Sequence, residues 1–238
     1  MKWLLITSAL LYLSSFRRPV FVLALSCSLI YLASRGVGLG RLPLIGPQDT
    51  LAFFSCSIGL MALPFVYSRG LSGDRFFAWG CGALAGLFAL FALPFPTLNM
   101  PLPPILDTYW FELHVALAFF AYALFGLAAL LGVLYLRREE RQILDLQYRA
   151  ALVGYSFFSL SMVSGGIWGY YAWGTYWLWT AKELWTSILW LYYSLYLHLR
   201  LKGQVWDRPF AWLGIVGFFV TLFTYLGVSM LMRSSHSF

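Results

Sequence analysis

Long apolar runs alternate with short polar connections along the whole chain. Eight runs can be delimited, at about 3–16, 19–34, 51–67, 76–95, 111–136, 148–171, 184–201 and 210–232. About 20 apolar residues in a helix cross the hydrocarbon core of a bilayer, so the pattern predicts an all-α integral membrane protein, a polytopic bundle of about eight transmembrane helices. The first two runs are the shortest. We expect them to tilt little, to thin the bilayer, or to form a hairpin that does not cross it fully.

Composition excludes the soluble classes of protein. Hydrophobic residues make up 61% of the chain and charged residues 11%, against about 25% charged residues in soluble domains. The net charge of +7 could suggest nucleic-acid binding, but the basic residues are dispersed between apolar runs, so no nucleic-acid partner is predicted. Cys27, Cys56 and Cys81 lie inside apolar runs without a CxxC pair or a neighbouring histidine. They indicate neither a disulfide framework nor a zinc site.

The distribution of basic residues predicts the orientation of the chain. With the N-terminus outside, the inner connections hold eleven of them: Arg17, Arg18, Arg69, Arg75, Arg137, Arg138, Arg141, Arg149, Arg200, Lys202 and Arg208. The outer segments hold five, namely Lys2, Arg35, Arg41, Lys182 and Arg233. By the positive-inside rule both termini are therefore expected to be extracytoplasmic. The first run ends in two arginines without a small-residue cleavage site before them, so we interpret it as a retained helix.

A proline-rich segment divides the chain. Residues 94–104 contain five prolines, which forbid a continuous helix and predict an irregular lid or an amphipathic stretch at the interface. We expect residues 1–95 to form an N-terminal four-helix membrane region. Residues 96–238 are then a second membrane region that includes a tryptophan-rich external segment, 168–185.

Three histidines are the first candidates for chemistry, because polar groups near a bilayer are costly. His114 lies near the outer end of the fifth run and His236 just past the eighth run on the same predicted side. His198 lies near the inner end of the seventh run. An isolated histidine at a helix end is also typical of a residue that simply sits at the interface.

Tryptophans crowd between two of these runs. The segment WGYYAWGTYWLWTAKELW contains Trp168, Trp173, Trp177, Trp179 and Trp185, and we expect its glycines to interrupt the helix. Such a segment could be an aromatic belt, but it could also form a flat apolar platform for a porphyrin. His114 and His236 could then ligate haem iron from opposite faces. Lys182 and Glu183 could be solvated charges, and Glu112 could cap the fifth helix.

Three segments resemble one known family. WGTYWLWTAKELWTSILWLYYSLYLHLR, at 173–200, is similar to the tryptophan-rich "WWD" signature of the haem-handling cytochrome c assembly family, in particular the CcsA/ResC branch of the system II synthase. WFELHVALAFFAYALFGLAALLGVLYL resembles the family's helix that begins with a haem-ligand histidine, and TYLGVSMLMRSSHSF its closing segment with a second one. The resemblance extends from about Tyr109 to the end of the sequence.

The resemblance implies roles for particular residues. His114 and His236 match the external pair that ligates haem, His198 matches an intramembrane histidine at which haem is taken up, and the tryptophans would hold the macrocycle. It implies haem b as substrate and ligand, a separate CcsB/ResB-type membrane subunit, and an apocytochrome c with a CxxCH motif. The expected function is that of a haem-handling subunit of a cytochrome c synthase (haem lyase), at the extracytoplasmic face of a bacterial cytoplasmic or thylakoid membrane. No residue of this chain is assigned as a covalent catalyst, because the apocytochrome supplies the thiols.

One departure from the family motif keeps other functions open. The usual WxWDPKE reads Trp177-Leu178-Trp179-Thr180-Ala181-Lys182-Glu183 here, so the carboxylate and the proline are lost. A haem exporter, or a HemX-like regulator of haem synthesis without synthase activity, is one alternative. A transporter that uses the histidines as proton relays is another, and it would need polar residues in the bundle interior, of which the sequence has few.

Overall fold

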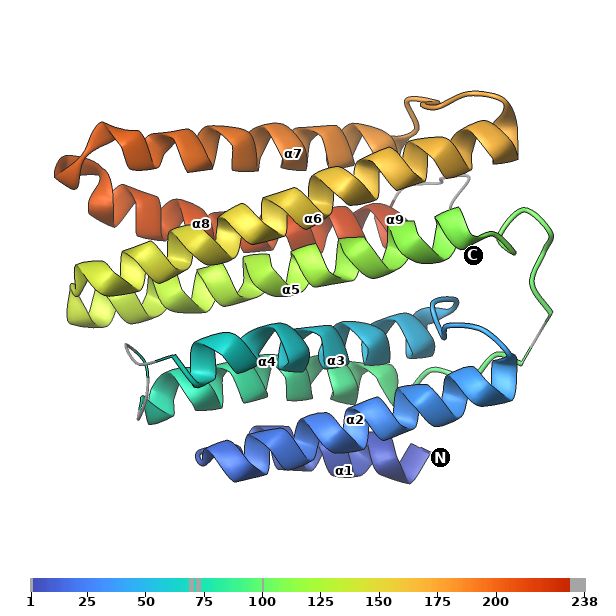
Figure 1. The fold of residues 1–238 in the computed structure, drawn as a ribbon, viewed down its shortest axis with the longest axis horizontal. Helices are drawn as coiled ribbons and strands as arrows, with labels where there is room; N and C mark the ends of the chain where they lie inside the picture. The colour runs from blue at the N-terminus through green and yellow to red at the C-terminus, as the bar shows by residue number, and fades with distance from the viewer. Residues whose placement is uncertain (1, 69–70, 72–73, 100, 232–238) are drawn as a thin grey trace. The chain divides into compact units, whose positions relative to one another are not determined.

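The chain folds into two compact units. The computed structural model describes residues 2–68, 71, 74–99 and 101–231. One unit is Met1–Pro101 and the other Leu102–Phe238; we call them unit 1 and unit 2. Each is a bundle in which consecutive helices run antiparallel (Figure 1). No strand occurs in the described ranges.

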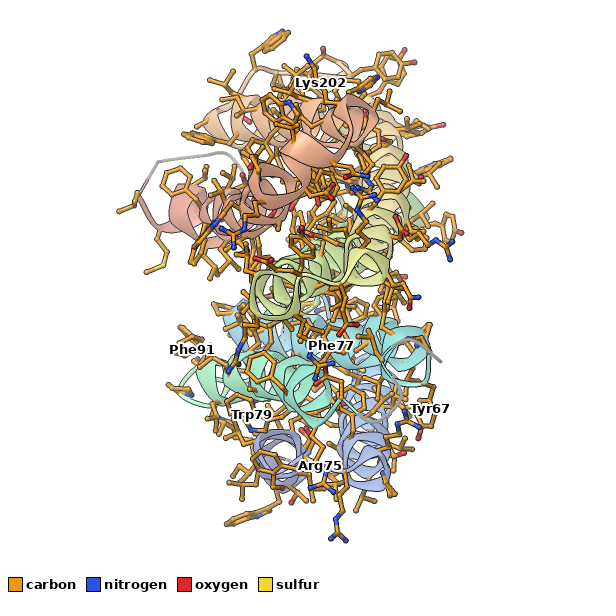
Figure 2. The ribbon with its side chains drawn as sticks, turned by 90° about the vertical axis from the view of Figure 1, so that its left-hand side faces the viewer. Tyr67, Arg75, Phe77, Trp79, Phe91 and Lys202 are labelled. Atoms are coloured by element: carbon orange, nitrogen blue, oxygen red, sulfur yellow. The ribbon has the colours of Figure 1, made fainter. Side chains whose placement is uncertain are left out.

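Unit 1 is built from helices whose ends follow from local sequence. Its described helices are α1 (Lys2–Leu13), α2 (Arg18–Leu39), α3 (Pro47–Val66) and α4 (Arg75–Ala92). Proline is the second residue of α2 and the first of α3, positions in the first turn where its missing N–H is harmless. Asp74 caps α4 by accepting a bond of 3.0 Å from the Phe77 amide. On α4, Phe77 is buried whereas Phe91 lies on the outer face (Figure 2).

A buried ion pair ties the start of the proline-rich segment to unit 1. Arg35 and Asp49 are 7% and 2% exposed, and the guanidinium donates to both carboxylate oxygens at 3.0 and 3.1 Å. The same guanidinium donates to the Leu98 carbonyl at 2.6 Å and to the Asn99 side chain. These bonds explain why the compact unit continues to Pro101 rather than ending near residue 95.

Unit 2 is an up-and-down arrangement of four long helices. They are α5 (Tyr109–Arg138), α6 (Arg141–Trp173), α7 (Ala181–Leu199) and α8 (Asp207–Leu222). Two 3-10 turns, η1 (Arg200–Lys202) and η2 (Gln204–Trp206), join α7 to α8. A π-helical turn, η3 (Phe223–Gly227), follows α8 and leads into α9 (Val228–Leu231).

The two ends of unit 2 differ in chemistry. The α5–α6 and α7–α8 connections lie together at one end (Figure 1), where Arg141 and Arg200 both pair with Asp207, at 3.2 and 3.1 Å. Arg208 pairs with Glu139 at the same end. The start of α5 and the α6–α7 connection form the opposite end, which we call the aromatic end of unit 2. Its exposed aromatic residues are Tyr109, Tyr170, Tyr171, Tyr176 and Trp179.

The helices confirm a polytopic helical membrane protein. Within the described residues, α1 to α8 match the eight predicted runs, and six helical segments are long and apolar enough to cross a bilayer. The first two runs, which the sequence predicts to be short, differ in length as helices. Helix α2 has 22 residues and is long enough to cross a bilayer, whereas α1 has 12 residues and is only about 18 Å long. Helices α5 and α6, with 30 and 33 residues, are roughly 45 to 50 Å long and exceed the ~30 Å hydrocarbon thickness. Part of this hairpin therefore extends beyond the hydrocarbon.

The ion pair in unit 1 generates a stability prediction. Arg35→Met leaves the Asp49 carboxylate buried without its partner, and we expect a loss of about 3 kcal/mol or more in unfolding free energy. Arg35→Met/Asp49→Leu removes both charges and should recover most of that loss. Unfolding midpoints of the detergent-solubilised variants test this, and equal midpoints for the single and double variants would contradict it.

Candidate functional site

His114 is held in one orientation by α6. It is the sixth residue of α5, and its Nδ1 lies 2.7 Å from the Ser161 carbonyl oxygen. A carbonyl can only accept, so Nδ1 carries the hydrogen and donates it. The Ser161 hydroxyl returns a bond of 2.9 Å to the His114 carbonyl. In the neutral ring Nε2 is then the nitrogen with the free lone pair, which is the arrangement that metal-ligating histidines adopt.

A glycine on α6 makes room for this ring. A Cβ at Gly165 would lie 2.5 Å from Nδ1 of His114 and 2.7 Å from its Cε1, closer than real side-chain contacts. The next residue, Gly166, faces elsewhere, and a Cβ there would make only an ordinary contact of 3.5 Å with the Tyr176 carbonyl. Any side chain at residue 165 would therefore displace the imidazole.

Trp168 forms the wall beside the imidazole. It is 3% exposed, its ring is nearly parallel to that of His114 at 6.4 Å between centroids, and Trp173 packs edge-on against it at 4.9 Å. Its indole N–H donates to the Ile105 carbonyl at 2.8 Å. The described part of the proline-rich segment is irregular, as predicted. The hydrogen bond from Trp168 holds Ile105, which directly follows this segment and precedes α5.

The tryptophan-rich segment is more helical than expected. Helix α6 continues through Gly169, because glycine can adopt the helical conformation. The helix ends at Trp173, because the next residue, Gly174, has a left-handed conformation with φ of 75°. Residues 175–180 form the connection, and α7 begins at Ala181. The expectation of a helix break at Gly169 was therefore wrong.

Glu183 organises this connection. Its Oε2 accepts from the amides of Leu178 and Thr180 at 3.0 and 2.8 Å and from the Thr180 hydroxyl at 3.1 Å. The residue between those two amides, Trp179, has φ of 56° and is 71% exposed. A left-handed tryptophan costs on the order of 1 to 2 kcal/mol, and the bonds to Glu183 hold it. The carboxylate thus displays the Trp179 indole at the aromatic end.

Thr180 performs the capping role of the missing acid. Its hydroxyl accepts from the Glu183 amide at 3.3 Å, and together they form a capping box at the start of α7. The loss of the family aspartate therefore leaves the turn into α7 intact.

Lys182 is not a solvated charge. Its side chain is partly buried, and Nζ donates to Ser229 Oγ on α9 at 3.0 Å. One turn further along α7, Trp185 packs against Phe223 of η3 at 4.6 Å between centroids. Tyr225 of η3 packs edge-on against Phe119 of α5 at 5.2 Å. The π-helical turn thus fills the space between α5 and α7 below the aromatic end, and such turns are frequent at functional sites.

The structure brings some predicted residues together and separates others. His114, Trp168 and Trp173 form one cluster, and Trp177 and Trp179 lie in the connection next to it. Trp185 faces η3 instead. His198 is exposed near the opposite end of unit 2, where its Nδ1 donates to the Ser194 carbonyl at 2.7 Å. His236 lies outside the described residues.

Sequence reasoning missed the residues that orient His114. Ser161 and Gly165 were not singled out, although a serine and a glycine four residues apart on an apolar helix indicate one face suited to close packing. No group of three or more metal-ligating side chains of the His, Cys, Asp and Glu types occurs in the described ranges.

The fold and the site define a polytopic helical membrane protein with an oriented imidazole beside an aromatic cluster at one end of its second unit. The family model described as "Cytochrome C assembly protein" matches residues 3–236. The chain belongs to this family, within its CcsA branch.

Curated relatives share the name "Cytochrome c biogenesis protein CcsA". The protein of Chlamydomonas reinhardtii is 32% identical over 217 residues, covering 84% of this chain and 61% of that protein. The protein of Guillardia theta is 28% identical over 258 residues, covering 91% and 83%. That of Prochlorococcus marinus strain MIT 9312 is 32% identical over 239 residues, covering 84% and 76%. The chain thus spans about three fifths of the Chlamydomonas protein.

The capping box generates a prediction about α7. Thr180→Ala removes the hydroxyl that accepts from the Glu183 amide, and we expect a loss of about 1 kcal/mol in unfolding free energy. Thr180→Ser keeps a hydroxyl and should unfold close to the parent protein. Unfolding midpoints in detergent measure both, and an unchanged midpoint for Thr180→Ala would show that the cap does not stabilise the helix.

Proposed function

We propose that the chain is a haem-handling subunit in cytochrome c maturation, which holds haem at the aromatic end of unit 2 and presents it to apocytochrome c. The observation that carries the proposal is the orientation of His114. Its Nδ1 is fixed by Ser161, its Nε2 is left to ligate iron, and Trp168 and Trp173 lie beside it. Membership of the cytochrome c assembly family supports the same chemistry.

Haem in this role is a substrate, and the chain's part is to bind and orient it. His114 would supply one axial ligand and His236 the second, while Trp173, Trp177 and the exposed Trp179 would contact the macrocycle. Ligation by two imidazoles and burial among aromatic rings tune the potential of the iron. Fixing the haem edge against an incoming peptide lowers the entropic part of the barrier to attachment.

The covalent step needs no residue of this chain as a nucleophile. Each apocytochrome thiol of a CxxCH motif adds across one haem vinyl group, so that sulfur bonds one vinyl carbon and the thiol proton ends on the other. The three cysteines of this chain are buried or half-buried within α2, α3 and α4 of unit 1, which agrees with a role in positioning.

The proposal includes an orientation and partners. The end of unit 2 that holds Arg141, Arg200 and Arg208, which we call the arginine-rich end, would face the cytoplasm by the positive-inside rule. The aromatic end would face outward in a bacterial cytoplasmic or thylakoid membrane. His198, near the arginine-rich end, would take up haem together with a CcsB/ResB-type subunit. Its ring has the same arrangement as His114, with Nδ1 bonded to a backbone carbonyl. The N-terminal region, unit 1, would serve as scaffold or partner-docking surface.

The threonine at residue 180 favours one alternative function, a haem-binding protein without synthase activity. Thr180 offers a hydroxyl, committed to the capping box, at the position where the family usually has a carboxylate. A haem exporter or a HemX-like regulator would keep the haem site and lack synthase activity. A cytochrome c maturation assay in cells that lack the endogenous synthase separates these functions from haem lyase activity.

Absorption spectra of the purified protein, expressed with a CcsB/ResB-type subunit, test the haem site. We expect a six-coordinate haem spectrum that His114→Ala diminishes. Gly165→Ala should diminish it as well, because its methyl group would occupy the place of the imidazole. Gly166→Ala is the matched control, since the added methyl makes only an ordinary contact, and should retain haem.

Two results would contradict the haem site. No haem in the parent protein under any expression condition would remove its chemical basis. Equal haem content in the parent protein and the His114→Ala and Gly165→Ala variants would show that haem binds elsewhere.

A further inference from the structure

Lys182 occupies an unfavourable place for a cation. It lies in the first turn of α7, where the helix dipole favours negative charge. Its side chain is partly buried, and the described structure gives its ammonium one hydrogen-bond partner, the neutral hydroxyl of Ser229. Removing an ammonium partly from water costs free energy, and most of that cost remains unless an anion pairs with it.

No carboxylate of the described residues compensates this charge. The adjacent Glu183 directs its Oε2 to the amides of Leu178 and Thr180, and the ion pairs formed by the described residues do not include Lys182. By contrast, Arg200 at the other end of α7 pairs with two aspartates. Among the described residues, the Lys182 ammonium is therefore a cation without a carboxylate partner.

The ammonium belongs to the same site as the imidazole. Lys182 lies at the start of α7 and His114 near the start of α5, both at the aromatic end of unit 2. The hydrogen bond of Lys182 to Ser229 reaches α9, which follows the π-helical turn packed against α5 and α7. A ligand that contacts the His114 ring and carries a negative group on its edge could therefore meet this charge.

We propose that Lys182 binds a carboxylate of the ligand held at the aromatic end, with Ser229 orienting the ammonium. This inference rests on the proposed haem function and specifies it, because the carboxylates of haem are its two propionates. An ion pair between Lys182 and a propionate would favour one orientation of haem in the site, with that propionate toward α7 and α9. The edge directed away from Lys182 would then be the one offered to an apocytochrome.

The test compares haem with haem dimethyl ester, in which both propionates are uncharged. Dissociation constants are measured by optical titration of the detergent-purified full chain with its partner subunit. We expect the parent protein to bind haem about tenfold or more tightly than the ester, the usual effect of one charge-assisted hydrogen bond. Lys182→Met should lower the affinity for haem to that for the ester, while the affinity for the ester stays the same.

Two variants control for charge and for folding. Lys182→Arg keeps a cation and should retain most of the preference for haem. Lys202→Met removes an exposed lysine at the α7–α8 connection (Figure 2) and should retain all of it. If Lys182→Met bound haem with the preference of the parent protein, the proposal would be overturned.

A lipid phosphate could also satisfy an ammonium near the interface, so the phosphorus content of the purified parent and Lys182→Met proteins is measured in parallel. Loss of phosphorus from the variant with an unchanged preference for haem over its ester would assign the charge to a lipid and overturn the proposal.

The outcomes also distinguish a failure of the haem function from a failure of the carboxylate site. A parent protein that binds neither porphyrin contradicts the haem function, whereas one that binds both equally, with a spectrum dependent on His114, contradicts only the carboxylate site.

Discussion

The close antiparallel packing of α5 against α6 is the contact on which the rest of unit 2 depends. Two glycines of α6 permit it, because a Cβ at Gly154 would meet the Phe125 ring at 3.0 Å and one at Gly165 would meet His114 at 2.5 Å. In a bilayer, where apolar side chains gain little by leaving lipid, such small residues let backbones approach and dispersion forces act. The approach also brings the Ser161 carbonyl within hydrogen-bond distance of the imidazole, so the packing that stabilises the hairpin orients the candidate ligand.

The polar groups of the bundle are largely satisfied locally. Serine and threonine hydroxyls inside the helices return to carbonyls of their own helix, as Ser164 does to Leu160 and Thr221 to Gly217. Such bonds hide polar groups from lipid without linking them into a path. They give little support to a transporter with a chain of proton relays. Bonds between helices are fewer: His114 to Ser161 and Lys182 to Ser229 lie toward the aromatic end, whereas Tyr155 to Ser194 and Gln147 to Ala211 lie farther from it.

Most of the fold could be predicted from the sequence, because in a membrane protein the length of an apolar run and the position of charged residues determine where helices begin and end. The predicted eight runs correspond to α1 to α8, and the proline-rich segment is irregular. The unit boundary and the end of α6 depend on contacts that a local pattern does not contain. Arg35 reaches across 63 residues to bond Leu98, and Gly169 stays helical because the helix tolerates glycine where neighbouring turns support it. The sequence identified His114 as a candidate, but its orientation depends on Ser161, 47 positions later.

In the tryptophan-rich connection, the charges of Lys182 and Glu183 are linked to the left-handed backbone conformation of Trp179. Glu183 and Lys182 are neighbours, yet the carboxylate bonds the backbone that displays Trp179 while the ammonium bonds toward α9. If the two charges had paired with each other, Trp179 would lose the bonds that hold its left-handed conformation, and the positive charge near His114 would be neutralised. Their separation instead produces an exposed indole on one side and an uncompensated cation on the other. A planar ligand with an apolar ring and an acidic edge has the chemistry to engage both.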